Sequence, residues 1–147
     1  MPKRVLIAED DPTEVFLLQR AFAAAEVPAT LHVVRDGQEA IDYLEGEAGF
    51  SDRGTYPLPD LLLLDLKMPR MNGFDVLGWL RQKPGLKRLL VTVLTSSDQP
   101  KDINRAYDLG ANSYLVKPHG STDLTELVRR VQRYWLESNR CAATLVE

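Results

Sequence analysis

The sequence predicts an α/β domain in which five parallel strands form one doubly wound sheet with helices on both faces. First, a short apolar run followed by an amphipathic segment recurs five times along the chain. Second, Leu61 to Leu64 is a continuous apolar run, as expected of a central strand covered on both faces. Third, 147 residues are enough for one compact domain and too few for two ordinary ones.

The first half of the chain holds three predicted strands and two predicted helices. The amphipathic stripes of the helices include Val15, Leu18 and Phe22 in the first and Ile41 and Leu44 in the second. The predicted strands are Val5 to Ala8, Leu31 to Val34 and Leu61 to Leu64, and the predicted helices are Pro12 to about Glu26 and Gln38 to Glu45. Before the first helix, the Asp-Pro-Thr-Glu sequence favours Asp11 as an N-cap over Asp11 as a metal ligand.

The second half continues the same alternation and ends in a long amphipathic helix. The predicted strands are Leu89 to Leu94 and Ser113 to Val116, and the predicted helices are Phe74 to Arg81, Lys101 to Leu109 and Ser121 to about Glu137. Gly110 is suited to the C-terminal cap of the helix before it. The apolar stripe of the last helix is Leu124, Leu127, Val128, Val131 and Trp135.

Two segments depart from this simple pattern. A Gly- and Pro-containing loop from Gly46 to Pro59 precedes the third strand, and a tail from Asn139 to Glu147 follows the last helix. We therefore predict one domain over residues 1–138 and a C-terminal tail over residues 139–147.

Composition and charge argue against several classes of protein. The net charge of −3 does not suggest a nucleic-acid-binding protein. No stretch approaches the roughly 20 apolar residues of a membrane helix. Cys141 is the only cysteine, so no disulfide can form within the chain. We expect a cytoplasmic protein that binds neither nucleic acid nor membrane.

Polar residues follow four of the five predicted strands. Glu9 and Asp10 follow the first strand and Asp65 follows the third. Thr95 follows the fourth strand and Lys117 follows the fifth. Because parallel sheets form their sites at the carboxyl ends of the strands, we expect these side chains to surround one pocket.

The chemistry of such a pocket is specific. Close carboxylates repel one another, and Mg²⁺ relieves this repulsion because it prefers oxygen ligands. A carboxylate can attack phosphorus to form an acyl phosphate, with positive charge and donors supporting the phosphoryl oxygens. Taken singly, Glu9 and Asp10 are explained as solvated loop acids, Lys117 as a surface lysine and Thr95 as a strand residue. Their joint placement favours a phosphoryl site.

These residues together resemble the receiver domain of two-component response regulators. The likeness extends from Lys3 to about Glu137, and the segment from Asp65 to Gly73 is particularly similar to the family's phosphoacceptor loop. The resemblance implies a flavodoxin-like sheet with strand order 2-1-3-4-5 and a receiver domain over residues 1–138.

The resemblance also implies the roles of the acidic residues. Asp65 is expected to accept a phosphoryl group from a phosphohistidine on a sensor histidine kinase. Mg²⁺ is expected to be bound by Asp10 and Asp65, by Glu9, often through water, and by the main-chain carbonyl of Lys67.

Further residues are expected to register the phosphoryl group. The resemblance implies that Thr95 and Lys117 bind it, that the bond between Lys117 and Pro118 is cis, and that Tyr114 is the aromatic switch residue. We expect Lys67 and Ser97, two residues after Asp65 and Thr95, to set the lifetime of the phosphate.

A narrower resemblance is to single-domain regulators that partner bacterial phytochromes. It rests on the long loop before the third strand, the Trp-Leu-Glu ending of the last helix, and the lack of an output domain. In that subgroup the fourth helix, fifth strand and fifth helix often form a homodimer face. Candidate residues for this face are Arg105, Tyr107, Tyr134 and Trp135, although simple core packing also explains Trp135.

Particular residues favour or disfavour three other functions. A receiver-like adaptor that is never phosphorylated is compatible with the sequence. A haloacid-dehalogenase-type phosphatase needs a second acid two residues after its nucleophile, where this chain has Lys67. A flavin or dinucleotide site is disfavoured because the acids after the first strand would repel phosphate.

Overall fold

The computed structural model describes residues 2–142 and contains one sheet of five parallel strands in the order β2-β1-β3-β4-β5. This confirms the predicted sheet and its strand order. The strands are β1 (Lys3–Ala8), β2 (Ala29–Val34), β3 (Leu61–Leu64), β4 (Leu90–Thr95) and β5 (Ser113–Val116). β1 and β2 each begin two residues earlier than predicted, because Lys3 and Arg4 pair in register with Ala29 and Thr30.

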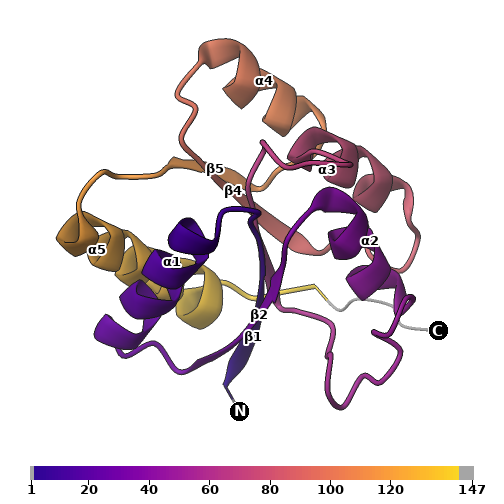
Figure 1. Cartoon of the computed structure of the whole chain (residues 1–147), viewed down its shortest axis with the longest axis horizontal. Coiled ribbons are helices and arrows are strands. Elements are labelled where there is room, and N and C mark those ends of the chain that lie inside the picture. Colours follow the sequence, from indigo (N-terminus) through magenta and orange to yellow (C-terminus); the bar gives the residue numbers. More distant parts are fainter. Residues whose placement is uncertain (1, 143–147) are drawn as a thin grey trace.

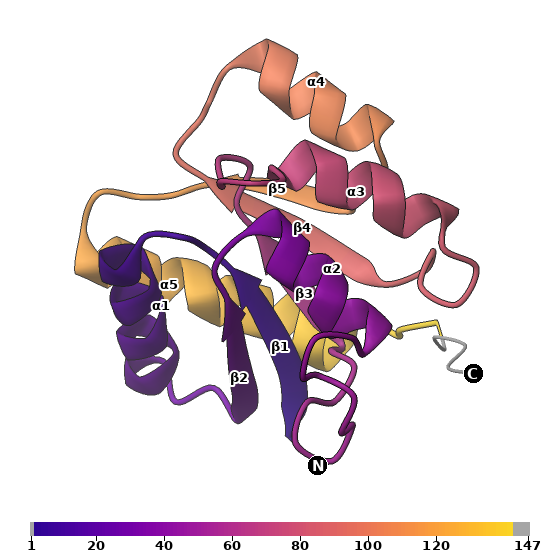
Figure 2. The ribbon, with the colours of Figure 1, turned by 45° about the vertical axis from the view of Figure 1, so that its right-hand side comes forward.

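Helices cover both faces of this sheet (Figures 1 and 2). Figure 2 shows α1 and α5 together on one side of the strands, with α2 and α3 on the other. The α-helices are α1 (Pro12–Ala24), α2 (Gly37–Glu45), α3 (Gly73–Gln82), α4 (Pro100–Asp108) and α5 (Ser121–Val131). In α4, Ala106 is the one buried residue, so this helix has the weakest apolar attachment.

Two apolar layers hold the helices on the sheet. Along β1, Val5 and Ile7 face the α1 and α5 layer, whereas Leu6 and Ala8 face the α2 and α3 layer. This alternation follows from the period of two in a strand. All four leucines of β3 are at most 3% exposed. Burial of one such side chain contributes about 1.5–3 kcal/mol, which fixes β3 at the centre of the sheet.

Local signals define where several helices begin and end. Asp11 accepts a hydrogen bond from the Thr13 amide at 2.9 Å, which confirms its predicted role as N-cap of α1. Gly110 follows α4 with φ of 105°, the left-handed backbone for which a C-terminal glycine is suited.

The last helix is not α-helical along the whole predicted range of Ser121 to about Glu137. After Val131 it continues as a π-helix, η1 (Gln132–Ser138). The wider π turn places residue i+5 over residue i. Leu136 therefore follows Val131 into the core, while Trp135 is only partly buried.

The loop from Gly46 to Pro59 has a defined conformation although it contains no strand or helix. The Arg53 guanidinium donates to the main-chain carbonyls of Tyr43 (2.8 Å), Leu44 (2.9 Å) and Tyr56 (3.1 Å). It thereby satisfies carbonyls at the end of α2 that have no partner within the helix.

At the other end of the chain, residues 139–142 leave η1 without regular structure, and the rest of the predicted tail lies outside the described residues. Cys141 is exposed and lies beside Arg4 and Asp60, at the edge where the strands begin. Within residues 2–142, no helix combines the length and apolar character that crossing a membrane requires.

Candidate functional site

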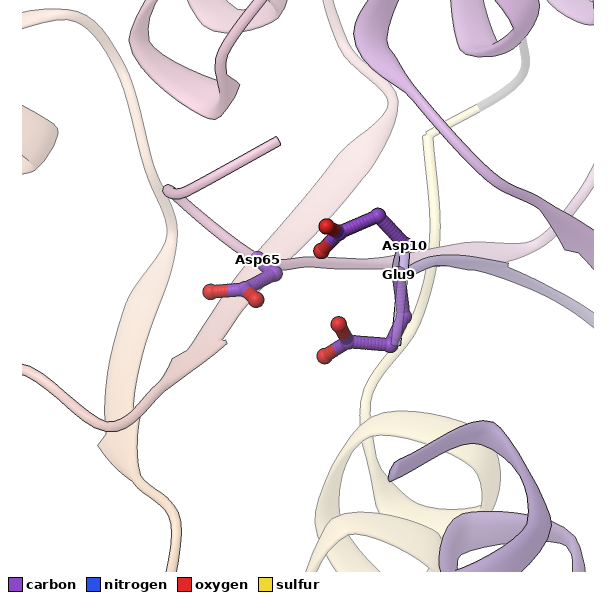
Figure 3. Close-up of side chains that lie close together, drawn as sticks. All are labelled: Glu9, Asp10 and Asp65. Atoms are coloured by element: carbon purple, nitrogen blue, oxygen red, sulfur yellow. The ribbon is translucent and has the colours of Figure 1, made fainter. Parts of the chain in front are cut away.

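Three carboxylates meet at the carboxyl-terminal edge of the sheet. Glu9 and Asp10 follow β1, Asp65 follows β3, and the two strands pair with Ala8 opposite Leu64. One carboxylate oxygen of each acid lies within 4.8 Å of the other two (Figure 3). Figure 3 shows the three side chains converging from these two adjacent strand ends. The predicted acidic cluster therefore forms, with oxygen donors suited to Mg²⁺.

Lys117 supplies the positive charge of this cluster. Its ammonium group donates to Glu9 and lies 3.4 Å from an Asp65 oxygen. The Lys117 amide donates to the Thr95 carbonyl at 2.7 Å, which fixes the backbone at the end of β5. Because its side chain is only 11% exposed, solvent screens these charges weakly.

Burial and the hydrogen bond between Glu9 and Lys117 act in opposite directions on the pKa values of this pair. Loss of water raises the pKa of Glu9 to about 7, although its hydrogen bond from Lys117 acts in the opposite direction. Burial lowers the pKa of Lys117, but the hydrogen bond to Glu9 and the charge of Asp65 outweigh it and leave that pKa raised. Lys117 therefore stays charged beside the acids at neutral pH.

Thr95 has a fully buried hydroxyl group that lacks a hydrogen-bond partner. Leaving a buried hydroxyl unpaired costs about 1–3 kcal/mol. The hydroxyl is at the end of β4, whose neighbours in the sheet, β3 and β5, lead into Asp65 and Lys117. An oxygen-rich group bound between these residues would satisfy it.

Ser97 links the β4–α4 connection to both α4 and β5. Its hydroxyl donates to Asp102 at 2.6 Å, and its carbonyl accepts from the Tyr114 hydroxyl at 2.9 Å. The Tyr114 ring packs against the core, and burial raises the pKa of its hydroxyl. Sequence reasoning missed Asp102; an acid in the first turn of α4, five residues after Ser97, was the available signal.

Gly73 allows the start of α3 to lie close to Asp65, the candidate phosphoacceptor. A Cβ atom at this position would lie 2.4 Å from the Asp65 carbonyl oxygen, so only glycine permits the approach. Lys67 is exposed, and its amide makes a long contact of 3.5 Å with the Asp65 carboxylate. Lys67 is thus beside the acids, as expected from its sequence position.

The bond between Lys117 and Pro118 is trans, and the prediction of a cis bond is wrong for this structure. The trans form is the ordinary preference of an X–Pro bond, by about 0.5–1 kcal/mol. With the trans bond in place, the Lys117 ammonium group still reaches both Glu9 and Asp65.

The four residues expected at a dimer face differ in their surroundings. Tyr107 and Tyr134 are 48% and 57% exposed. Arg105 lies over the Phe74 ring, with its guanidinium carbon 4.1 Å from the ring centre. Trp135 is partly buried against the α1 and α5 layer and meets Tyr134 edge-on, so core packing accounts for much of its side chain.

The acids, the lysine and the unpaired threonine together can bind a divalent cation and a phosphoryl group. Residues 5–129 match the response regulator receiver domain family. Since this match spans most of the chain, the protein belongs to the response regulator receiver family.

Solved structures of similar proteins narrow the class. A response regulator in red light signaling of R. palustris is 39% identical, with a TM-score of 0.92 over 98% of this chain and 100% of that one. The phosphorylated cyanobacterial phytochrome response regulator RcpA is 34% identical, with a TM-score of 0.89 over 97% and 100%. The Mn²⁺-bound form of response regulator Rcp1 is 34% identical, with a TM-score of 0.85 over 97% and 100%. The chain is homologous to phytochrome response regulators.

Proposed function

We propose that Asp65 accepts a phosphoryl group from a phosphohistidine of a sensor histidine kinase, assisted by Mg²⁺. The observation that carries this proposal is the meeting of Glu9, Asp10 and Asp65 within 4.8 Å, with the Lys117 ammonium group beside two of them. The side chains of these acids and the Lys67 carbonyl would hold the metal ion, which supplies positive charge to the phosphoryl oxygens.

The transfer conserves atoms and charge in a simple way. A carboxylate oxygen of Asp65 attacks phosphorus and forms the O–P bond of an acyl phosphate, while the N–P bond of the donor breaks and its imidazole nitrogen keeps the electron pair. Lys117 stabilises the phosphoryl oxygens, and the unpaired Thr95 hydroxyl donates to one of them. Attack by water later releases inorganic phosphate, and a small acyl phosphate can replace the kinase as donor.

The modification acts as a switch because it changes the charge next to a movable segment. A phosphoryl group adds about −1.5 to −2 charge at neutral pH. When Thr95 turns toward it, the β4–α4 connection must adjust two residues further on, where Ser97 is hydrogen-bonded to Asp102 of α4 and to Tyr114 of β5. Lys67 and Ser97, which flank the site, set how long the phosphate persists.

The partner in this proposal is a bacterial phytochrome acting as the kinase. The homologous regulators of red light and phytochrome signalling support this choice. A cytoplasmic location follows from the proposal, since such kinases use cytoplasmic ATP. The exposed Tyr107 and Val116 on α4 and β5 support a homodimer through the α4–β5–α5 face.

Intact-mass spectrometry after incubation with acetyl phosphate and Mg²⁺ tests the proposal. We expect a phosphoryl adduct on the wild-type chain and on Asp108→Asn, an exposed control acid on α4, but none on Asp65→Asn. The adduct should require Mg²⁺. Metal binding without any adduct, from acetyl phosphate or from a phosphorylated kinase, would favour an adaptor that is never phosphorylated.

A further inference from the structure

The loop after Asp65, residues 66–72, has few anchors of its own. The side chains of Leu66 and Met68 are 3% and 9% exposed and pack in the core layer under α2 and α3. Lys67, whose carbonyl is proposed as a metal ligand, lies between these two buried residues. The second half of the loop turns outward into solvent and needs another attachment.

Arg70 has an unfavourable backbone conformation in that second half. Its φ of 64° lies in the left-handed region, which costs a residue with a side chain about 1–2 kcal/mol. Asparagine or glycine is the usual residue for such a position. Interactions of the arginine side chain must therefore compensate for the backbone conformation.

Asp36 provides that interaction from the start of α2. Arg70 Nε lies 3.0 Å from one Asp36 carboxylate oxygen, and Arg70 Nη2 lies 3.1 Å from the other. Two parallel bonds of this kind fix orientation as well as distance. Asp36 is itself held as the N-cap of α2, since it accepts from the Glu39 amide at 2.8 Å.

A second contact ties the loop to the same helix. A Cβ atom at Gly37 would lie 1.9 Å from the Met71 carbonyl oxygen, so the two backbones touch. α2 in turn is fixed by its buried residues Ala40 and Leu44. The outer half of the loop is therefore braced against a helix that is anchored in the core.

We propose that Arg70, through its paired bonds to Asp36, is a positioning residue that keeps the Lys67 carbonyl in place for the divalent cation. This role rests on the proposed function, because it concerns the same metal site. Arg70 carries a positive charge, which by itself would weaken cation binding. Its effect through geometry therefore opposes its effect through charge, and the two can be separated.

The effect of geometry can be separated from the effect of charge by measuring Mn²⁺ binding to the full chain. The electron paramagnetic resonance signal of free Mn²⁺ reports this binding. Arg70→Gln removes the paired bonds to Asp36 and the positive charge. Asp36→Ser removes the acceptor of those bonds and the negative charge, but it keeps an N-cap residue at the start of α2. We expect both variants to bind Mn²⁺ about 3- to 10-fold more weakly, somewhat below the loss typical of a group bonded directly to a ligand. Arg35→Gln, at an exposed neighbour of Asp36, should bind Mn²⁺ at least as tightly as wild type.

If Arg70→Gln binds Mn²⁺ more tightly than wild type and Asp36→Ser binds it more weakly, charge alone explains both changes in affinity. That result would overturn the positioning role of Arg70. Urea unfolding without metal is the control for fold, and we expect a change within about 1 kcal/mol because the pair is solvent-accessible. A wild-type chain that binds no Mn²⁺ would instead overturn the proposed metal site, and the role of Arg70 with it.

Discussion

Lys117 supplies the positive charge that pairs with two of the three acids of the candidate site. The ammonium group pairs with Glu9, which is 2% exposed, and lies near Asp65, which is 8% exposed. Removing either partner of such a pair destabilises the protein, because the remaining charge is then buried without compensation. The lysine therefore has a structural role in addition to the proposed contact with the phosphoryl group.

We predict that Lys117→Met destabilises the metal-free protein by about 3 kcal/mol at pH 8, the lower end for a broken buried pair. Urea unfolding measures this change, and 10 mM Mg²⁺ should recover much of it by supplying the missing positive charge. Lys101→Met, at an exposed position of α4, is the control and should change stability by less than about 0.5 kcal/mol. Equal stability of the two variants would contradict the prediction.

Tyr43 gives a prediction for alkaline pH. Burial raises the pKa of its hydroxyl to about 12, against the opposing charges of Arg53 and Arg4. An unfolded tyrosine ionises near pH 10. The native state therefore holds this proton more tightly than the unfolded state, so its stabilising effect is complete below about pH 10 and is lost as pH rises toward about 12.

Urea unfolding between pH 8 and pH 11.5 tests this effect. Tyr43→Phe should lose less stability than wild type over the upper part of this range, although it starts lower because the bond to the Pro57 carbonyl is missing. Tyr107→Phe, at an exposed tyrosine, should follow the wild-type curve. Parallel curves for wild type and Tyr43→Phe would refute the assignment.

At the scale of elements, α4 is held more by polar contacts than by apolar packing. It buries Ala106 alone, and its N-cap residue Gln99 makes no side-chain capping bond. The bond from the Ser97 hydroxyl to the Asp102 carboxylate instead ties the first turn of α4 to the β4–α4 connection. This weak attachment is suited to a helix that is proposed to move on phosphorylation.

We predict that Asp102→Ala raises amide hydrogen exchange in the first turn of α4 about tenfold, which corresponds to about 1.4 kcal/mol. Asp102→Asn should stay close to wild type, because its side-chain oxygen still accepts from Ser97. Exchange measured by NMR on unphosphorylated protein decides the matter. Unchanged exchange in Asp102→Ala would show that Ser97 does not hold this turn.

Helices and strands with a regular pattern of apolar residues could be predicted from the sequence. Local departures from regular helix geometry could not. The Leu61 to Leu64 strand was predicted to the residue because a buried central strand tolerates no polar position. The π-helical turn after Val131 leaves no pattern that distinguishes it from an α-helix over so short a length.

At the scale of the whole molecule, the proposed homodimer can be tested through its exposed aromatic side chain. Tyr107→Glu places a charge on the α4–β5–α5 face and should abolish association of the phosphorylated protein, as measured by analytical ultracentrifugation. Phe16→Glu adds the same charge on α1, where Phe16 is 55% exposed, and should leave association unchanged. Loss of association in both variants, or in neither, would contradict an interface at this face.

Topology explains why the candidate site was largely predictable from sequence. Once the strands are parallel, Glu9, Asp65, Thr95 and Lys117 must lie at one edge of the sheet, whatever the details of packing. The pairing of Arg70 with Asp36 spans 34 positions between two loops, and no periodic signal connects them. Whether the Lys117–Pro118 bond is cis or trans depends on a free-energy difference of under about 1 kcal/mol. This difference is too small for the sequence to predict the isomer.

The position of Cys141 gives this molecule a convenient chemical handle. The thiol is exposed, has no other cysteine to compete with it, and lies beside Asp60 at the edge where the strands begin. The acids are at the other edge, about 16 Å away if each residue from Asp60 to Asp65 advances about 3.3 Å. A maleimide dye on the unmodified sequence therefore labels one known point, at the edge of the sheet opposite the candidate site. The native chain can then be followed by fluorescence without any engineered substitution.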